Sequence, residues 1–160
     1  MYIVILGAGE VGYTLAKILC YENQDVALVE QDPKRLKRAR DNLDIKVIEG
    51  SASSYHSLEE AGIKNADIVV AVTNNDEVNL IACMIANKYE VPKKVVRVKN
   101  REFTRESAPL NDRIYRSRSS SISTGELSIQ STFAGEYEVR AVPTGEIVVS
   151  FHGGRILTRT

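Results

Sequence analysis

Short apolar runs alternate with amphipathic segments along the first part of the chain. Each run is rich in Val, Ile and Leu and is bounded by Gly, Pro or Asp, which is typical of strands buried on both faces of a parallel sheet. The runs occupy residues 2–6, 25–30, 45–48, 67–72 and 94–98. The segments between them place apolar residues at helical spacing. Strands that alternate with helices in this way predict a doubly wound α/β fold, with a parallel sheet and helices on both faces.

Two of the predicted helices have distinct sequence features. Asp32 followed by Pro33 predicts a helix start, because Asp is a favoured N-cap and Pro a favoured first-turn residue. The helix predicted over 76–88 places five apolar residues on one face, which we expect to be buried. These residues are Val78, Ile81, Ala82, Ile85 and Ala86.

The alternating pattern weakens after residue 101. Residues rich in Ser and Arg, with little periodicity, predict a linker. Two later runs, 137–142 and 146–151, predict strands, and Pro143-Thr144-Gly145 between them is typical of a hairpin turn. The expected organisation is a Rossmann-like domain over 1–110, a linker over 111–135 and a short irregular or β-hairpin-like C-terminal tail over 136–160.

Composition excludes several classes of protein. The 160 residues include 21 Lys+Arg and 21 Asp+Glu, so no net field attracts nucleic acid or anionic lipid. No apolar stretch approaches the roughly 20 residues that span a bilayer, and the N-terminal residues do not resemble a signal peptide. The 2 Cys and 2 His residues form no disulfide framework and no metal-ligand cluster. We therefore expect a reduced, cytoplasmic protein without a metal site or direct membrane insertion.

A glycine-rich motif follows the first strand and opens the first helix. It consists of Gly7, Ala8, Gly9, Glu10, Val11 and Gly12. In a G-x-G-x-x-G motif the first glycine permits a tight turn, the second lets a pyrophosphate approach the backbone, and the third lets the helix lie close to the strand. Phosphate then binds the N–H groups at the helix N-terminus. The context predicts a nucleotide site, and the alternative is a turn with a structural role only.

An acidic residue, Glu30, ends the second strand. We expect it to be partly exposed and to accept both ribose hydroxyls of an adenosine, and its charge favours NAD over NADP. The alternative is a solvated loop acid. Lys34 and Arg35 lie close in the sequence and weaken the argument against NADP, but a basic run on a helix is usually a solvated face.

Residues 1–100 resemble the nucleotide-binding domain of the Trk/Ktr-type potassium uptake regulators, also called RCK or KTN domains. The most specific segment is Thr-Asn-Asn-Asp-Glu-Val-Asn-Leu at 73–80, since dehydrogenases share the glycine motif and the acid. Further matching segments are 4–12, 28–36, 59–67 and 96–100. The family usually continues into a sixth strand, for which residues 110–115 are a candidate, and a long helix that is not evident here.

The resemblance implies which residues line the site. The glycine motif binds the phosphates and Glu30 binds the ribose. Beyond these, the implied residues are Ser51, Thr73, Asn74 and Arg97. Ser51 would lie beside the adenine, while Thr73 and Asn74 would lie across the crevice, where Thr73 could equally be a strand-end cap. Arg97, on a buried strand, needs an anion. We favour a ligand phosphate over Glu77 as the anion that pairs with Arg97.

The implied function is regulatory, with no catalytic residues. The chain would be a cytoplasmic, nucleotide-sensing subunit that binds NAD or NADH, or alternatively ATP or ADP. It would form a homo-oligomer, lie at the inner face of the membrane through a partner, and gate a potassium-translocating membrane subunit by conformational change. The alternatives are a small NAD-dependent oxidoreductase, which would need a proton-transfer group beside its substrate, and an interaction module without ligand.

Overall fold

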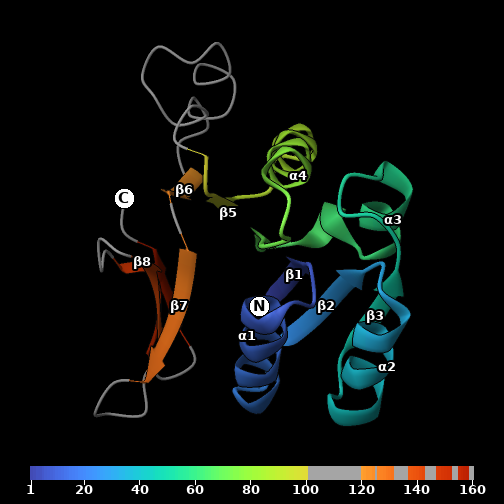
Figure 1. The fold of residues 1–160 in the computed structure, drawn as a ribbon, viewed down its shortest axis with the longest axis horizontal. Coiled ribbons are helices and arrows are strands. Elements are labelled where there is room, and N and C mark those ends of the chain that lie inside the picture. Colours follow the sequence, from blue (N-terminus) through green and yellow to red (C-terminus); the bar gives the residue numbers. More distant parts are fainter. Residues whose placement is uncertain (101–119, 125, 132–136, 143–146, 153–154, 159–160) are drawn as a thin grey trace.

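Six parallel strands form the central sheet in the computed structural model (Figure 1). The structure describes residues 1–100 and the strand segments 120–124, 126–131, 137–142, 147–152 and 155–158. The sheet has the order β3-β2-β1-β4-β5-β6. Its strands are β1 (Tyr2–Leu6), β2 (Asp25–Glu30), β3 (Lys46–Glu49), β4 (Ile68–Ala71), β5 (Lys93–Val98) and β6 (Ser120–Thr124). The predicted doubly wound α/β fold is confirmed.

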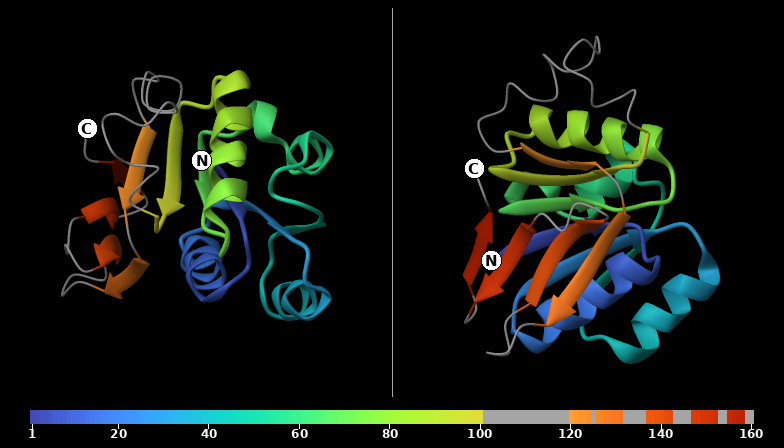
Figure 2. Two further views of the ribbon diagram at one scale, coloured as in Figure 1. Left: turned by 45° about the horizontal axis from the view of Figure 1, so that its top comes forward. Right: turned by 60° about the vertical axis from the view of Figure 1, so that its left-hand side comes forward.

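Helices cover both faces of this sheet (Figure 2). They are α1 (Glu10–Tyr21), α2 (Pro33–Asn42), α3 (Tyr55–Glu60), the 3-10 turn η1 (Ile63–Asn65) and α4 (Asp76–Lys88). Side chains from α1 and α2 pack on one face, and those from α3, η1 and α4 on the other. Because successive residues of a strand point to opposite faces, β1 contributes Ile3 and Ile5 to one core and Val4 and Leu6 to the other.

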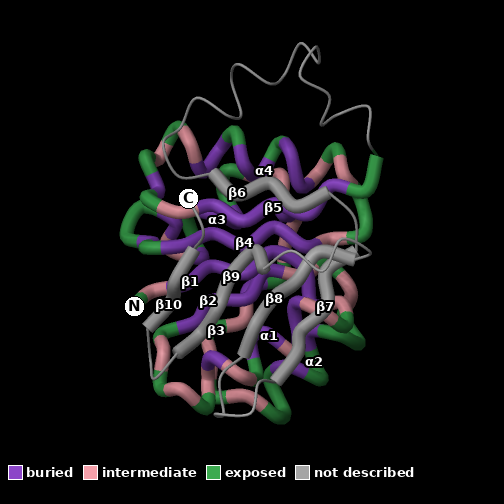
Figure 3. The backbone as a smooth tube through the Cα atoms, turned by 90° about the vertical axis from the view of Figure 1, so that its left-hand side faces the viewer, coloured by how far each residue is buried: buried purple, intermediate pink, exposed green. Residues whose placement is uncertain are grey.

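The central strands are the most deeply buried part of the molecule (Figure 3). Val4, Ile5 and Leu6 are each 0% exposed, as the continuous apolar run predicts for a strand covered on both faces. Each such side chain contributes about 1.5–3 kcal/mol of burial free energy. Rigid strands of this kind hold the loops that follow them in fixed positions.

The chain changes direction across the sheet between β1 and β4. From β1 it builds outward through β2 to β3, then crosses to β4 and continues through β5 to β6. The loops that follow β1 and β4 therefore diverge at neighbouring carboxyl ends, where doubly wound sheets bind their ligands. Gly7 N–H donates to Val29 O at 2.8 Å, and Val72 N–H donates to Leu6 O at 2.9 Å, so both loops remain attached to the sheet where they begin.

A second sheet follows the central one. It is antiparallel, with the order β10-β9-β8-β7, and comprises β7 (Glu126–Ser131), β8 (Tyr137–Val142), β9 (Ile147–His152) and β10 (Arg155–Thr158). The predicted pair of strands at 137–142 and 146–151 corresponds to β8 and β9, which pair as expected. The turn predicted between them lies outside the described residues. The second sheet extends the tail beyond the single hairpin that the sequence predicted.

Two strands lie in the range 111–135, where the sequence predicted a linker. β6 pairs along β5, and β7 pairs along β8. Backbone hydrogen bonds to a neighbour hold an edge strand, and a Ser-rich composition does not reveal them. Residues 110–115, the candidate sixth strand, lie outside the described part, and the sixth strand of the sheet is β6. The division into three domains stays a prediction.

The buried face of α4 differs from the predicted one. Ile81 is 45% exposed, whereas Asn79 and Cys83 are each 0% exposed. The prediction for Ile81 was therefore wrong, although those for Ala82, Ile85 and Ala86 are confirmed. The helix is rotated because Asn79 faces inward and forms hydrogen bonds to the loop after β4 and to β5.

Candidate functional site

The three glycines of the motif have different structural roles. Gly7 has a φ of +101°, a backbone conformation that side chains disfavour. A Cβ on Gly12 would lie 1.8 Å from Gly7 O, so only glycine allows α1 to approach β1 this closely. A Cβ on Gly9, in contrast, would meet nothing within 4 Å. Packing therefore explains Gly7 and Gly12 but not Gly9, whose open face borders a cleft.

The start of α1 faces the same cleft. Gly9 is the N-cap and provides no side-chain hydrogen bond to the first turn, although its carbonyl accepts from Tyr13 N–H at 2.9 Å. The side chains of Asp32, Ser54 and Asn75 cap α2, α3 and α4. The first-turn N–H groups and the positive end of the helix dipole at α1 suit a phosphate group.

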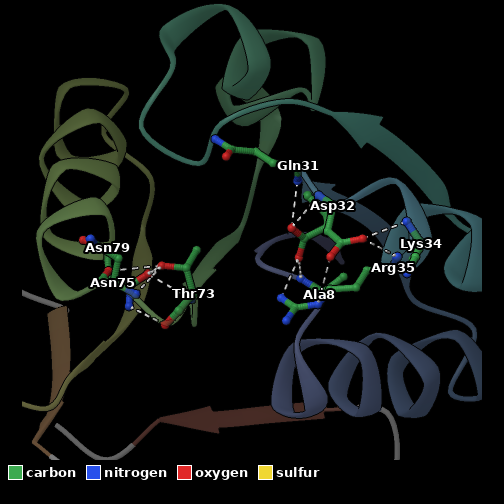
Figure 4. A network of polar contacts seen from close by, with 9 residues as sticks. Ala8, Gln31, Asp32, Lys34, Arg35, Thr73, Asn75 and Asn79 are labelled. Carbon is green, nitrogen blue, oxygen red and sulfur yellow. Dashed lines mark hydrogen bonds and ion pairs between the residues drawn. The ribbon is translucent and has the colours of Figure 1, made fainter.

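Glu30 links the end of β2 to the glycine-rich loop, because its carboxylate accepts hydrogen bonds from Ala8, Gln31 and Asp32, which Figure 4 labels. Its Oε2 accepts Ala8 N–H at 2.6 Å, and its Oε1 accepts Gln31 N–H at 2.8 Å and Asp32 N–H at 3.0 Å. The side chain is only 10% exposed, less than the sequence suggested. Arg35 Nη1 approaches the same Oε2 at 3.6 Å. Glu30 therefore has a structural role besides any role toward a ribose.

The start of α2 places a cation, Arg35, beside Glu30. Asp32 accepts Lys34 N–H at 2.8 Å and Arg35 N–H at 3.3 Å, and these backbone hydrogen bonds hold the pKa of the Asp32 carboxyl below its usual value. Arg35 Nε also lies 4.0 Å from Asp32 Oδ2. Arg35 is exposed, as predicted for a basic run on the solvated face of a helix, but it also lines the cleft.

The opposite wall of the cleft is the loop after β4, which the side chain of Asn79 on α4 anchors (Figure 4). Asn79 Oδ1 accepts Thr73 N–H at 3.0 Å and the Thr73 hydroxyl at 2.7 Å. Asn79 Nδ2 donates to Thr73 O at 3.1 Å and to Arg97 O at 2.9 Å. The hydroxyl of Thr73 also lies 3.1 Å from Asn75 O. No role of Asn79 was predicted, although a polar residue between Val78 and Leu80 on an amphipathic helix was a usable signal.

The cleft lies between these two walls and has a volume of about 220 Å³. It is lined by Gly7, Gly9, Val29, Glu30, Gln31, Arg35, Gly50, Ala52, Val72, Thr73, Asn74, Asn75 and Val78. A pocket that encloses a whole ligand measures roughly 300–1,000 Å³. The cleft therefore suits one nucleotide half, and a dinucleotide would extend past it along the edge of the sheet.

The remaining predicted residues lie around the cleft. Glu10 is exposed and Val11 half-buried in the first turn of α1. Ser51 lies between two lining residues, with its hydroxyl 3.0 Å from that of Ser53. Arg97 is 8% exposed and does not line the cleft; its carbonyl, rather than its guanidinium, meets the Asn79 side chain. Its contact with a ligand phosphate stays a prediction.

Gly9, the start of α1 and Glu30 together fit an adenosine nucleotide on structural grounds. Gly9 leaves room that a Cβ would occupy, the first turn of α1 supplies N–H donors, and the Glu30 carboxylate lies beside both. Phosphates accept hydrogen bonds and ribose hydroxyls donate them, so each group meets its complement. In the described part of the chain, groups of three or more His, Cys, Asp or Glu that could hold a metal ion are absent.

Replacement of Glu30 by Ala is expected to destabilise the domain by about 1–3 kcal/mol, because the N–H groups of Ala8, Gln31 and Asp32 lose the carboxylate that accepts their hydrogen bonds. Urea denaturation monitored by circular dichroism measures the change. Glu60→Ala, at the exposed end of α3, is the control and should stay within about 0.5 kcal/mol. Equal stability of the two variants would contradict the structural role of Glu30.

The fold and the cleft define a Rossmann-type α/β domain. The family model described as the TrkA-N domain matches residues 3–111, and the chain belongs to this family. The "Trk system potassium uptake protein TrkA" of Vibrio alginolyticus is 43% identical over 111 residues, which cover 69% of this chain and 24% of the relative. The TrkA homolog of Methanothermobacter thermautotrophicus is 45% identical over 100 residues, 62% of this chain and 46% of the relative. The chain thus spans less than half the length of these relatives.

Solved structures confirm the fold. The TrkA-N domain of the inner membrane protein ybaL from Escherichia coli superposes with a TM-score of 0.64 at 14% identity, covering 78% of this chain and 87% of that one. The Kef C-terminal domain of Shewanella denitrificans, solved in its AMP-bound form, gives 0.56 at 24% identity, covering 63% and 61%.

Two further expectations concern enzymatic activity and the membrane. The relatives carry the names of potassium uptake proteins, in agreement with the prediction that the chain is not an enzyme. As for the membrane, the helices within the described residues are all too short or too polar to span it.

Proposed function

We propose that this chain is the nucleotide-sensing domain of a potassium uptake system, binding NAD or NADH, or alternatively ATP or ADP, in the cleft beside Gly9. The observation that carries the proposal is the convergence of the open face of Gly9, the start of α1 and the Glu30 carboxylate on one cleft. The names of the relatives support the potassium system, and the AMP-bound form of one structural neighbour supports an adenosine ligand.

A ligand in this position contacts both halves of the sheet. Glu30 and the glycine-rich loop form one wall, and Thr73 and Asn74 form the other. The second wall is continuous with the chain that leaves β5, since Asp76 Oδ2 accepts Lys99 N–H at 2.8 Å and Asn100 N–H at 2.7 Å. A movement of the loop after β4 would therefore also displace the chain at Lys99 and Asn100.

Regulation then follows from differential affinity. Two nucleotides that differ in length or charge stabilise different arrangements of the walls, and each shifts the equilibrium only by its preference for one arrangement. Coupling of about 1–3 kcal/mol is the usual scale for such effects. The partner in this proposal is a potassium-translocating membrane subunit, which the chain gates as a homo-oligomer at the cytoplasmic face of the membrane.

Potassium uptake in cells lacking the gene for this protein tests the proposal. Deletion is expected to impair growth at limiting potassium, and the wild-type protein, but not Gly9→Val, is expected to restore it. The variant must accumulate to wild-type levels, which immunoblotting checks. Normal uptake in the deleted cells, or full rescue by the variant, would contradict the proposed role.

A further inference from the structure

Arg35 lines the cleft beside Glu30. Its side chain extends from the first turn of α2 toward Ala8 in the glycine-rich loop (Figure 4). Nη1 lies 3.6 Å from Glu30 Oε2, the same oxygen that accepts Ala8 N–H. The side chain is 44% exposed, so solvent and ligand both reach it.

The carboxylate of Glu30 is already engaged by the chain itself. A carboxylate has about four lone-pair positions for donors. Oε1 holds Gln31 N–H and Asp32 N–H, while Oε2 holds Ala8 N–H and faces Arg35. The three backbone donors are fixed by the fold, whereas the arginine side chain can rotate. A ribose hydroxyl that donates to Oε2 therefore takes the place of the Arg35 guanidinium.

The displaced guanidinium can pair with another anion nearby. Asp32 offers a weak alternative at 4.0 Å and is 46% exposed on its side chain, so solvent screens it. One position for such an anion is the start of α1 beside Ala8, whose N–H shares Glu30 Oε2 with Arg35 and where free first-turn N–H groups suit a 5′-phosphate. A planar guanidinium suits a phosphate, since it donates two parallel hydrogen bonds.

We propose that Arg35 is a specificity-determining residue that exchanges its ion pair with Glu30 for the 5′-phosphate of a bound adenosine nucleotide. This inference rests on the proposed function, in that it assumes that a nucleotide occupies the cleft. It assigns Arg35 to recognition of the phosphate, and it makes the ribose and phosphate contacts interdependent. Adenosine alone breaks the Glu30–Arg35 pair without replacing it, whereas AMP and ADP replace it.

Isothermal titration of the full chain with adenosine, AMP, ADP and 2′,5′-ADP tests this inference on wild type, Arg35→Gln and Arg40→Gln. Arg40 is exposed in the last turn of α2, and its replacement by Gln is the control because it removes the same charge. Arg35→Gln is expected to weaken AMP and ADP binding about ten- to a hundredfold, to leave adenosine binding unchanged or tighter, and to melt like the wild type. Arg40→Gln is expected to bind all four ligands as the wild type does.

Four outcomes would overturn the inference while the proposed function stands. Equal losses for adenosine and ADP would place Arg35 on the base or the ribose. A loss confined to 2′,5′-ADP would assign it to a 2′-phosphate. Unchanged ADP binding, or an equal loss in Arg40→Gln, would remove any specific role. Absence of binding to the wild type for all four ligands would instead refute an adenosine site, and the inference with it.

Discussion

Replacement of Gly12 by Ala is expected to prevent the domain from folding, or to destabilise it by at least about 4 kcal/mol, beyond the range of ordinary substitutions. The added Cβ would lie 1.8 Å from Gly7 O, 3.0 Å from Gly7 C and 3.3 Å from Val72 Cγ2. Gly7 cannot move away easily, because its N–H is bonded to Val29 O at 2.8 Å and its φ is +101°. Relief of the clash therefore requires α1 to separate from β1.

The matched control is Gly9→Ala, two residues into the same motif. A Cβ there has open space, and the φ of −63° and ψ of −172° suit any residue. Its expected cost is no more than about 1 kcal/mol, since alanine is only a poorer N-cap than glycine. Circular dichroism and urea denaturation compare the two variants. A Gly12→Ala protein with near wild-type stability would show that the close helix–strand approach is not required.

Replacement of Asn79 by Leu is expected to cost about 3 kcal/mol or more. The leucine fits a buried position but removes the hydrogen bonds that Asn79 makes with Thr73 N–H, Thr73 C=O and Arg97 C=O. Each unsatisfied buried group costs about 1–3 kcal/mol. Because the loop after β4 loses its anchor, nucleotide affinity is expected to fall in the fraction that still folds.

Asn87→Leu is the control on the same helix. Among the described residues, the buried Asn87 Oδ1 has no hydrogen-bond partner. Its replacement is therefore expected to leave the stability unchanged or to raise it. Urea denaturation of both variants gives the difference in the free energy of unfolding. Equal effects of the two substitutions would contradict the anchoring role of Asn79.

Sequence reasoning predicted the parts of the fold that rest on local patterns. The strands of the first half, the Asp32 cap of α2 and the span of α4 follow from apolar periodicity and capping chemistry. β6 was not predicted, because an edge strand depends on hydrogen bonds to β5 that are distant in the sequence. β7 does alternate, with Leu127 and Ile129 between polar residues, but the Ser-rich context obscured this signal.

The cleft was predictable as a location but not in its polar detail. The glycine motif and Glu30 were predicted from their spacing. Of the predicted residues, Gly7, Gly9, Glu30, Thr73 and Asn74 line the cleft, whereas the other four residues of the motif do not. The side-chain direction of Arg35 and the inward rotation of Asn79 depend on tertiary contacts that periodicity does not encode. The engagement of Glu30 by three backbone donors likewise appears only when β2 and the glycine-rich loop are brought together.

The most direct test of the account is an equilibrium titration of the purified chain and its Gly9→Val variant with NAD, NADH, ATP and ADP. A Cβ at residue 9 would meet nothing within 4 Å and the φ of −63° suits any residue, so the Gly9→Val variant is expected to fold, which circular dichroism checks. The proposed nucleotide site predicts saturable binding of at least one of these nucleotides to the wild type and none to the variant at millimolar concentration. Absence of binding to the wild type, or equal affinity in a folded Gly9→Val protein, would contradict it.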